Sequence, residues 1–302
     1  MNTEWEGDGP AALSPEYHAR AWERLGSEQF DVVVVGGGVV GVGAALDAAT
    51  RGLRVALVEA RDIASGTSSR SSKMFHGGLR YLEQLEFGLV REALRERELS
   101  LRLLAPHLVR PLPFLFPLTK RLWERPYVSA GLFLYDRMGG AKSVPGQSQV
   151  TRSGALRVAP ALKRNSLIGG IRYYDTVVDD ARHTMMVART AAHYGAVIRT
   201  STQVVGFLRE ADRVMGVRVR DSDTGAITEV RAHCVINAAG VWTDEVQALS
   251  KERGHFKVRA SKGVHIVVPR DRIVSETAII LRTANSVLFV IPWETHWIIG
   301  TT

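Results

Sequence analysis

Three glycines near the start of the chain have the spacing of a phosphate-binding turn. Gly36, Gly38 and Gly41 satisfy G-x-G-x-x-G between an apolar run at 31–35 and an Ala-rich stretch at 39–51. The run predicts a buried parallel strand, and the stretch predicts a helix. The first glycine permits a tight turn, the second lets the backbone approach a pyrophosphate, and the third lets helix and strand pack closely. The anion would meet the amides and the positive dipole end of the helix N-terminus.

An acidic residue follows where such a unit binds a ribose. A second apolar run, 54–59, predicts a buried strand that ends at Glu59, eighteen residues beyond Gly41. An acidic side chain there accepts hydrogen bonds from an adenosine ribose, so the strand, turn, helix and strand together predict a dinucleotide-binding βαβ unit. No arginine adjoins Glu59 before Arg61, which argues modestly against NADP. The motif leaves NAD and FAD open.

Two further segments offer small residues to an extended ligand. The serine- and glycine-rich stretch 64–78 would let backbone run along a flat ligand while hydroxyls bond phosphate, although a flexible loop is the alternative. In 235–242 an apolar strand opens through Ala239 and Gly240 into a helix expected at 239–250, whose N-terminal amides would lie near the dinucleotide. A plain strand-to-helix turn is the alternative there.

Composition predicts a globular chain with a net positive charge. The 302 residues are 45% apolar and 23% charged, which suggests about two domains, and the net charge of +8 suits a phosphate ester, an anionic membrane surface or nucleic acid. Scattered basic residues without a basic–aromatic platform argue against nucleic acid. The single cysteine, Cys234, excludes a disulfide framework and a cysteine-based metal site, so we expect a reducing compartment and no metal.

The N-terminal residues and the most apolar helix bear on location. Residues 1–29 are polar, acidic at the start and unlike a secretory signal, so we expect a cytoplasmic protein with an N-terminal extension. The helix expected at 127–138 is shorter than the ~20 residues needed to span a bilayer. The run 126–135 and nearby arginines suit contact with anionic headgroups, but a core helix fits the run better.

The remaining chain predicts two interleaved domains. We expect one from 30–105 with 176–250 and a second from 106–175 with 251–302. A long helix is expected at 86–104, a break at Pro111, Pro113 and Pro117, and a helix at 180–194 capped by Asp179. Short β-branched runs predict strands at 196–207, 213–220, 226–236, 264–268, 278–282, 287–291 and 297–299.

Five ordered segments carry a resemblance to a known family. They are Ser71 to Leu82 (SSKMFHGGLRYL), Val235 to Trp242, Tyr174 to Arg182, Lys262 to Pro269, and Phe289 to Trp293 leading to Gly300-Thr301-Thr302. From about residue 31 to 302 the chain resembles the FAD-dependent glycerol-3-phosphate dehydrogenases. The resemblance implies an α/β fold with a Rossmann-type FAD domain, like that of D-amino-acid oxidase, and an interleaved, mostly β substrate domain.

The resemblance also implies a reaction in glycerol metabolism and its residues. It implies oxidation of sn-glycerol 3-phosphate to dihydroxyacetone phosphate by hydride transfer to FAD, with electrons passed to a quinone. His76 is the candidate base or orienting donor, Arg80 and Tyr81 suit the substrate phosphate, and Arg259 and Lys262 resemble further cationic contacts, with solvated charge as the alternative. The cofactor-binding candidates are Gly36, Gly38, Gly41, Glu59, Thr67, Ser68, Ser71, Ser72, Lys73, Gly77, Gly78, Leu79, Ala239 and Gly240.

Several alternatives stay open at this point. An oxidase of the same substrate would use oxygen as acceptor, and a non-catalytic flavin-binding fragment is a third reading. The family continues past Thr302, so we expect a truncated chain, for which weak FAD binding or inactivity is an outcome to consider. A peripheral contact with the inner face of the cytoplasmic membrane and a homodimer are also open.

Overall fold

The chain divides into two compact units. The computed structural model describes residues 10–78, 81–82, 84–120, 123–138, 143–250, 257–283 and 287–300. Unit 1 is Met1–Ser71 with Asp180–Ala260, and unit 2 is Ser72–Asp179 with Ser261–Thr302. The two units interleave much as expected. Residues 72–105, however, belong to unit 2 and not to the unit that contains the glycine motif. The reason is that β3 (Met74–Phe75) pairs with β6 (Gly169–Val178), and α4 (Phe87–Leu99) packs on α5 (Glu124–Met138).

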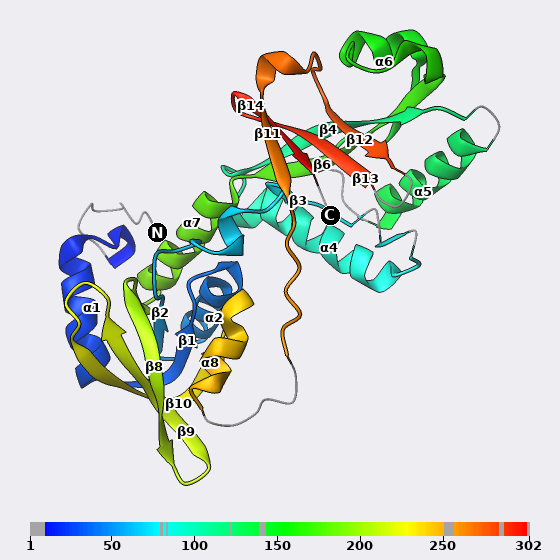
Figure 1. The fold of residues 1–302 in the computed structure, drawn as a ribbon. Coiled ribbons are helices and arrows are strands. Elements are labelled where there is room, and N and C mark those ends of the chain that lie inside the picture. The colour runs from blue at the N-terminus through cyan, green and yellow to red at the C-terminus, as the bar shows by residue number, and fades with distance from the viewer. Residues whose placement is uncertain are drawn as a thin grey trace. The chain divides into compact units, whose positions relative to one another are not determined.

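Unit 1 is built on a mixed sheet that contains the predicted βαβ unit (Figure 1). Its described strands run in the order β7-β2-β1-β10-β9-β8, with β1 parallel to both β2 and β10, and β2 parallel to β7. Strands β8 and β9 continue the sheet antiparallel. The bounds are β1 Gln29–Val35, β2 Val55–Val58, β7 Val197–Arg199, β8 Thr202–Glu210, β9 Arg213–Asp221 and β10 Ile227–Asn237.

Helices pack on this sheet and bury its central strands. Val33 and Val34 of β1 are fully buried, as expected for a parallel strand that reads as a continuous apolar run. The described helices are η1 Pro10–Ala12, α1 Pro15–Ser27, α2 Val39–Thr50, η2 Thr67–Ser69, α7 Asp180–His193, η5 Gly240–Trp242 and α8 Thr243–Ala248. The helix expected at 239–250 is therefore shorter, because a 3₁₀ turn precedes α8.

The N-terminal extension contributes to the core of unit 1. Ser14 caps α1 by accepting a hydrogen bond of 3.2 Å from the Tyr17 amide, and Pro15 occupies the first helical position. Tyr17, Ala21 and Leu25 recur every fourth residue and are buried in the same cluster as β1 and β7. The described part of the N-terminal extension thus includes a helix that packs into the core of unit 1.

Unit 2 is built around a second sheet, as expected for the second domain, and it also contains the helices α4 and α5. Its described strands run in the order β11-β14-β13-β12-β4-β6-β3, and β5 also pairs with β6. The further bounds are β4 Val109–Leu118, β5 Ser148–Thr151, β11 His265–Pro269, β12 Ala278–Arg282, β13 Val287–Trp293 and β14 His296–Gly300. The other helical segments are η3 Ser100–Leu104, α6 Arg152–Val158, η4 Arg164–Ser166 and η6 Arg270–Arg272.

The three prolines at 111, 113 and 117 lie inside a strand, so the expected break in architecture is wrong. β4 pairs antiparallel with β6 along its whole length, from Val109 opposite Val178 to Leu118 opposite Gly169. All three prolines are at odd positions, so their missing N–H groups belong to the same edge of the strand. The ladder with β6 can use the even positions, and β12 pairs with β4 only at residues 114 and 115. The missing N–H groups of the three prolines therefore cost β4 little stability.

Two helices of unit 2 differ from expectation at their ends. The helix expected at 86–104 becomes π-helical after Leu99, in the turn Ser100–Leu104. The helix expected at 127–138 starts at Glu124, because Pro126 falls in its first turn, where no intrahelical N–H is needed. The Glu124 carboxylate accepts from the amides of Thr119 and Lys120 at 2.6 and 2.7 Å.

Within the described ranges, no helix combines the length and apolar character required to cross a bilayer.

Candidate active site

Two positions, one in the turn between β1 and α2 and one in the first turn of α2, accept only glycine. Gly36 has a φ of +115°, and a Cβ there would lie 2.5 Å from the carbonyl oxygen of Ala238. A Cβ at Gly41 would collide with the carbonyl oxygen of Gly36. The glycines therefore let α2 begin directly after β1 and beside the end of β10.

The N-terminus of α2 fits the pyrophosphate of a dinucleotide such as FAD. Gly38 is its N-cap residue and supplies no side chain to the helix end. The Val39 amide donates to the Ser68 hydroxyl at 2.9 Å, and a Cβ on Gly38 would lie 3.2 Å from that hydroxyl. Thr67 begins the 3₁₀ turn that carries Ser68. A bare glycine cap, first-turn amides and a serine hydroxyl form a cradle that suits an anion.

Glu59 ties the glycine turn to the end of β2. One carboxylate oxygen accepts from the Gly37 amide at 2.6 Å, and the other accepts from the Arg61 amide at 2.9 Å. The side chain remains partly exposed, and each carboxylate oxygen has a second lone pair. The expected contact with a ribose stays a prediction, and the contact with Gly37 is a structural function that the spacing did not reveal.

The segment after β10 also turns beside the glycine motif. The Ala238 amide donates to the Val35 carbonyl at 2.8 Å, and the Ala239 amide donates to Asn237 Oδ1 at 3.2 Å. Gly240 follows with a φ of +58°. Asn237 was not among the candidates, although asparagine before a small-residue turn is a known signal for this kind of side-chain to backbone bond.

The Ser71–Leu79 run is divided between the units. In unit 1, the amide and hydroxyl of Ser71 donate to Asp180 Oδ2 at 3.1 and 2.6 Å. In unit 2, the Ser72 hydroxyl lies 3.0 Å from Nε2 of His265, and the Lys73 carbonyl accepts from the Val178 amide at 2.9 Å. These contacts hold each segment to its own unit. Cofactor contacts by Ser71, Ser72 and Lys73 stay predictions.

His76 sits on a tight glycine turn in unit 2. Its side chain is exposed, and its Nδ1 accepts a hydrogen bond of 3.1 Å from the Gly78 amide. Gly78 has a φ of +72°, and a Cβ there would lie 2.6 Å from the Tyr81 ring. A Cβ on the buried Gly77 would collide with Leu94 and with the Tyr135 hydroxyl. Both glycines are thus required for the turn that presents His76.

A buried polar network lies under this turn. Arg97 Nη1 donates to Asp175 Oδ1 at 2.9 Å, the Tyr135 hydroxyl lies 3.0 Å from Asp175 Oδ2, and the Gly77 amide donates to the Tyr135 hydroxyl at 2.8 Å. All three side chains are nearly fully buried. Burial raises the pKa of Asp175 above its usual range, although Arg97, His76 and Tyr135 oppose the rise, and burial also raises the pKa of Tyr135.

For the other candidate site residues we describe exposure alone. Tyr81 is 40% exposed. Arg259 in unit 1 and Lys262 in unit 2 are both exposed. Leu79 and Arg80 lie outside the described residues. Their expected functions stay predictions.

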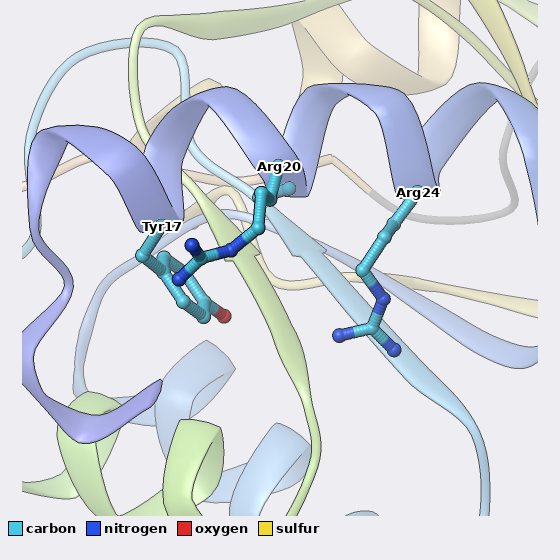
Figure 2. A pocket seen from close by; sticks show the side chains of 4 residues that line it. Tyr17, Arg20 and Arg24 are labelled. Carbon is cyan, nitrogen blue, oxygen red and sulfur yellow. The ribbon is translucent and has the colours of Figure 1, made fainter. Parts of the chain in front are cut away.

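The described hollow on α1 contains none of these residues. It is lined by Tyr17, Arg20, Ala21 and Arg24, all from α1 of unit 1, as Figure 2 shows for the labelled side chains. Arg24 is paired with Glu28 at 2.6 Å, and the Tyr17 hydroxyl is bonded to β7. The Tyr17 and Arg24 side chains are thus held by contacts within unit 1.

The comparisons with known proteins define the class. Residues 31–302 match the family "DAO: FAD dependent oxidoreductase", and the chain belongs to this family, whose cofactor is FAD. The Rossmann-type fold with an interleaved, mostly β unit is thus confirmed.

Within this family, the relatives show which enzymes the chain resembles. The chain is 79% identical over 292 residues to "Glycerol-3-phosphate dehydrogenase" of Mycobacterium leprae, covering 97% of this chain and 50% of that protein. It is 41% identical to the human mitochondrial glycerol-3-phosphate dehydrogenase, covering 95% of this chain and 41% of that protein. A solved glycerol-3-phosphate dehydrogenase from Bacillus halodurans, complexed with FAD, matches with a TM-score of 0.72 and 29% identity, covering 96% of this chain and 50% of that one. The resemblance found in the sequence is confirmed, and the chain spans about half the length of the M. leprae relative.

Proposed function

We propose that this chain carries the FAD-binding part and a portion of the substrate site of an enzyme that oxidises sn-glycerol 3-phosphate to dihydroxyacetone phosphate. The observation that carries the proposal is 79% identity, across nearly the whole chain, to a protein named glycerol-3-phosphate dehydrogenase. The glycine cradle at α2 supports the cofactor part independently, because a glycine cap without a side chain leaves the helix N-terminus open to an anion.

FAD, when bound, supplies the acceptor for a hydride from the carbinol carbon. We assign its pyrophosphate to Gly36, Gly38, Gly41 and Ser68, and its ribose to Glu59. The further cofactor contacts proposed are Thr67, Ser71, Ser72, Lys73, Gly77, Gly78, Leu79, Ala239 and Gly240.

We assign His76 to the substrate alcohol as an orienting donor. When Nδ1 accepts from the Gly78 amide, the neutral imidazole carries its proton on Nε2. The ring can then donate from Nε2 to the substrate oxygen. A base at Nδ1 would first have to give up the bond from Gly78, so of the two functions expected from the sequence the geometry supports the donor.

The substrate phosphate is assigned to cationic and phenolic groups. Arg80 provides a planar fork that can bind two phosphate oxygens, and Tyr81 adds a hydroxyl. Arg259 and Lys262 supply further positive charge, and both are exposed. The net charge of +8 would draw a dianionic substrate to the protein.

We propose a quinone as the final acceptor, reached from the inner face of the cytoplasmic membrane. The dehydrogenase names of the relatives support an acceptor other than oxygen. The apolar side chains Trp123, Tyr127 and Phe133 on or beside α5 are each about half exposed, and Arg125 and Arg137 lie on the same helix. Aromatic and basic side chains together suit a membrane interface.

An anaerobic absorbance titration tests the reaction. The purified chain is loaded with FAD and titrated with sn-glycerol 3-phosphate, and bleaching of the flavin band is expected with this substrate but not with glycerol or lactate. Recovery of the band on adding a water-soluble quinone, faster than on adding oxygen, supports the acceptor. Bound flavin that stays oxidised would contradict the proposed function of this chain.

A further inference from the structure

The buried network under the His76 turn has a defined hydrogen-bond direction. Asp175 is paired with Arg97 at 2.9 Å, so the ionised carboxylate is an acceptor only. The Tyr135 hydroxyl therefore donates its single proton to Asp175 Oδ2, and its lone pair is left to accept from the Gly77 amide. The chain of donors runs from Gly77 to Tyr135 to Asp175.

Three distant parts of unit 2 meet in this network. Arg97 is on α4, Tyr135 is on α5 and Asp175 is on β6. Arg97 is 6% exposed, Asp175 2% and Tyr135 1%. Burial of a charged pair is costly unless it is well bonded, and replacing such a pair by apolar side chains is often neutral or stabilising. Stability alone therefore does not account for an ion pair that is linked through the Tyr135 hydroxyl to a backbone amide of the candidate site.

The network is linked to His76 through the Gly77–Gly78 turn, and one amide of this turn bonds to the His76 ring. The Gly77 amide, fixed by Tyr135, immediately precedes the Gly78 amide, which donates to His76 Nδ1 at 3.1 Å. The Gly77 amide belongs to the planar peptide that joins His76 to Gly77, so its bond to Tyr135 fixes the peptide plane directly attached to His76, one Cα before the Gly78 amide. Leu94 also packs against Gly77, which leaves the turn little room to shift.

We propose that Tyr135, held by the Asp175–Arg97 ion pair, is a positioning residue that fixes the Gly77–Gly78 turn and thereby keeps the His76 proton on Nε2. The inference deepens the proposed function, on which it rests for the substrate. Its structural part concerns this chain alone.

The test compares Tyr135→Phe with Tyr17→Phe in the isotope-labelled chain. Tyr17 is a buried tyrosine of unit 1 whose hydroxyl also accepts from a backbone amide, that of Ile198 at 2.9 Å, so its substitution leaves the network in unit 2 in place. For Tyr135→Phe we expect amide hydrogen exchange at Gly77 to accelerate by about tenfold or more, since its hydrogen-bond acceptor is lost. The ¹⁵N shifts of His76 should move toward a mixture of tautomers. Tyr17→Phe should leave both readouts at wild-type values.

Flavin reduction supplies the functional readout. With FAD bound, Tyr135→Phe should slow reduction at saturating sn-glycerol 3-phosphate by about tenfold, with the substrate dissociation constant changed by less than about twofold, because orientation rather than binding is lost. A wild-type chain that the substrate does not reduce would contradict the proposed function and leave the NMR result to decide the positioning.

Three results would overturn the inference. They are unchanged His76 shifts in folded Tyr135→Phe, equal effects of the two tyrosine substitutions, and rapid exchange of the Gly77 amide in the wild-type chain. The last measurement needs no variant, so it decides the matter even where Tyr135→Phe does not fold.

Discussion

The carboxylate of Glu59 accepts a hydrogen bond of 2.6 Å from the backbone amide of Gly37, so the end of β2 holds the glycine turn that precedes α2. Its second oxygen is bonded to the Arg61 amide. The same side chain thus serves the shape of the turn as well as the proposed ribose contact.

Glu59→Ala should weaken FAD binding by at least about tenfold, because it removes two hydrogen bonds from the turn and the proposed partner of the ribose. The dissociation constant can be measured from flavin fluorescence on titration of the apoprotein. Asp47→Ala is the control, since Asp47 forms an exposed ion pair with Arg51 on α2. Equal affinity in Glu59→Ala and wild type would remove Glu59 from the cofactor site.

Gly38→Val should abolish FAD binding, because a β-branched side chain at the cap of α2 would fill the space beside Ser68. Gly43→Ala is the matched control, since a Cβ at Gly43 meets nothing within 4 Å. That control should keep its flavin and gain slightly in stability, by less than about 1 kcal/mol. The flavin absorbance of the purified variants checks both expectations, and a yellow Gly38→Val protein would place the cofactor elsewhere.

His76→Gln and His76→Ala distinguish a donor from a base. Glutamine keeps an N–H group near the position of Nε2, so flavin reduction should be slowed less by glutamine than by alanine if His76 orients the substrate. We expect a difference of about tenfold in the rate at saturating substrate. Stopped-flow absorbance measures it. Equal loss in both variants would favour the base.

Arg80→Ala should raise the dissociation constant of sn-glycerol 3-phosphate by about 10²-fold or more, because a charged donor fork to the phosphate is lost, while FAD stays bound. Arg102→Ala is the control, since Arg102 is an exposed arginine of unit 2. Anaerobic titration of each variant gives the constant. Loss of flavin from Arg80→Ala would instead indicate a function in cofactor binding.

The stability of unit 1 should depend on the charge of Asp221. Burial alone raises its pKa, but the amides of Thr224 and Asp223 and the Arg199 guanidinium outweigh burial and hold the pKa below the ordinary value. Because the folded pKa is lower than the unfolded one, this contribution is fully present above the unfolded value of about 3.9 and is lost as pH falls through the folded value. The free energy of unfolding of the wild type, measured in urea, should therefore decrease as pH falls through that window. Asp221→Asn should remove this part of the pH dependence.

At higher pH the same pair can be tested directly. Asp221→Ala should lower the free energy of unfolding by about 3 kcal/mol, since Arg199 would be left buried and unpaired. Glu229→Ala, which removes an exposed partner of Arg218, should cost less than about 1 kcal/mol. Similar losses in the two variants would mean that burial of the Arg199–Asp221 pair contributes nothing.

The cofactor unit was predictable because its signals are local. The glycines at 36, 38 and 41 lie within six residues of one another, and sterics within the turn or against the adjacent strand end require glycine at 36 and 41. The apolar runs of β1 and β2 and the position of Glu59 follow from the same short stretch. The sequence by itself therefore determined the dinucleotide-binding turn and, through its ordered motifs, the family.

Only the tertiary structure decided what surrounds His76. Arg97, Tyr135 and Asp175 are far apart in the sequence, and each alone reads as an ordinary helix or strand residue. Their pairing depends on which faces of α4, α5 and β6 are buried together, and burial is what makes their hydrogen bonds matter. The prolines of β4 were misleading for the same reason, because the cost of a missing N–H depends on which edge of the strand is paired. Local spacing carries no information about partners that only packing brings together.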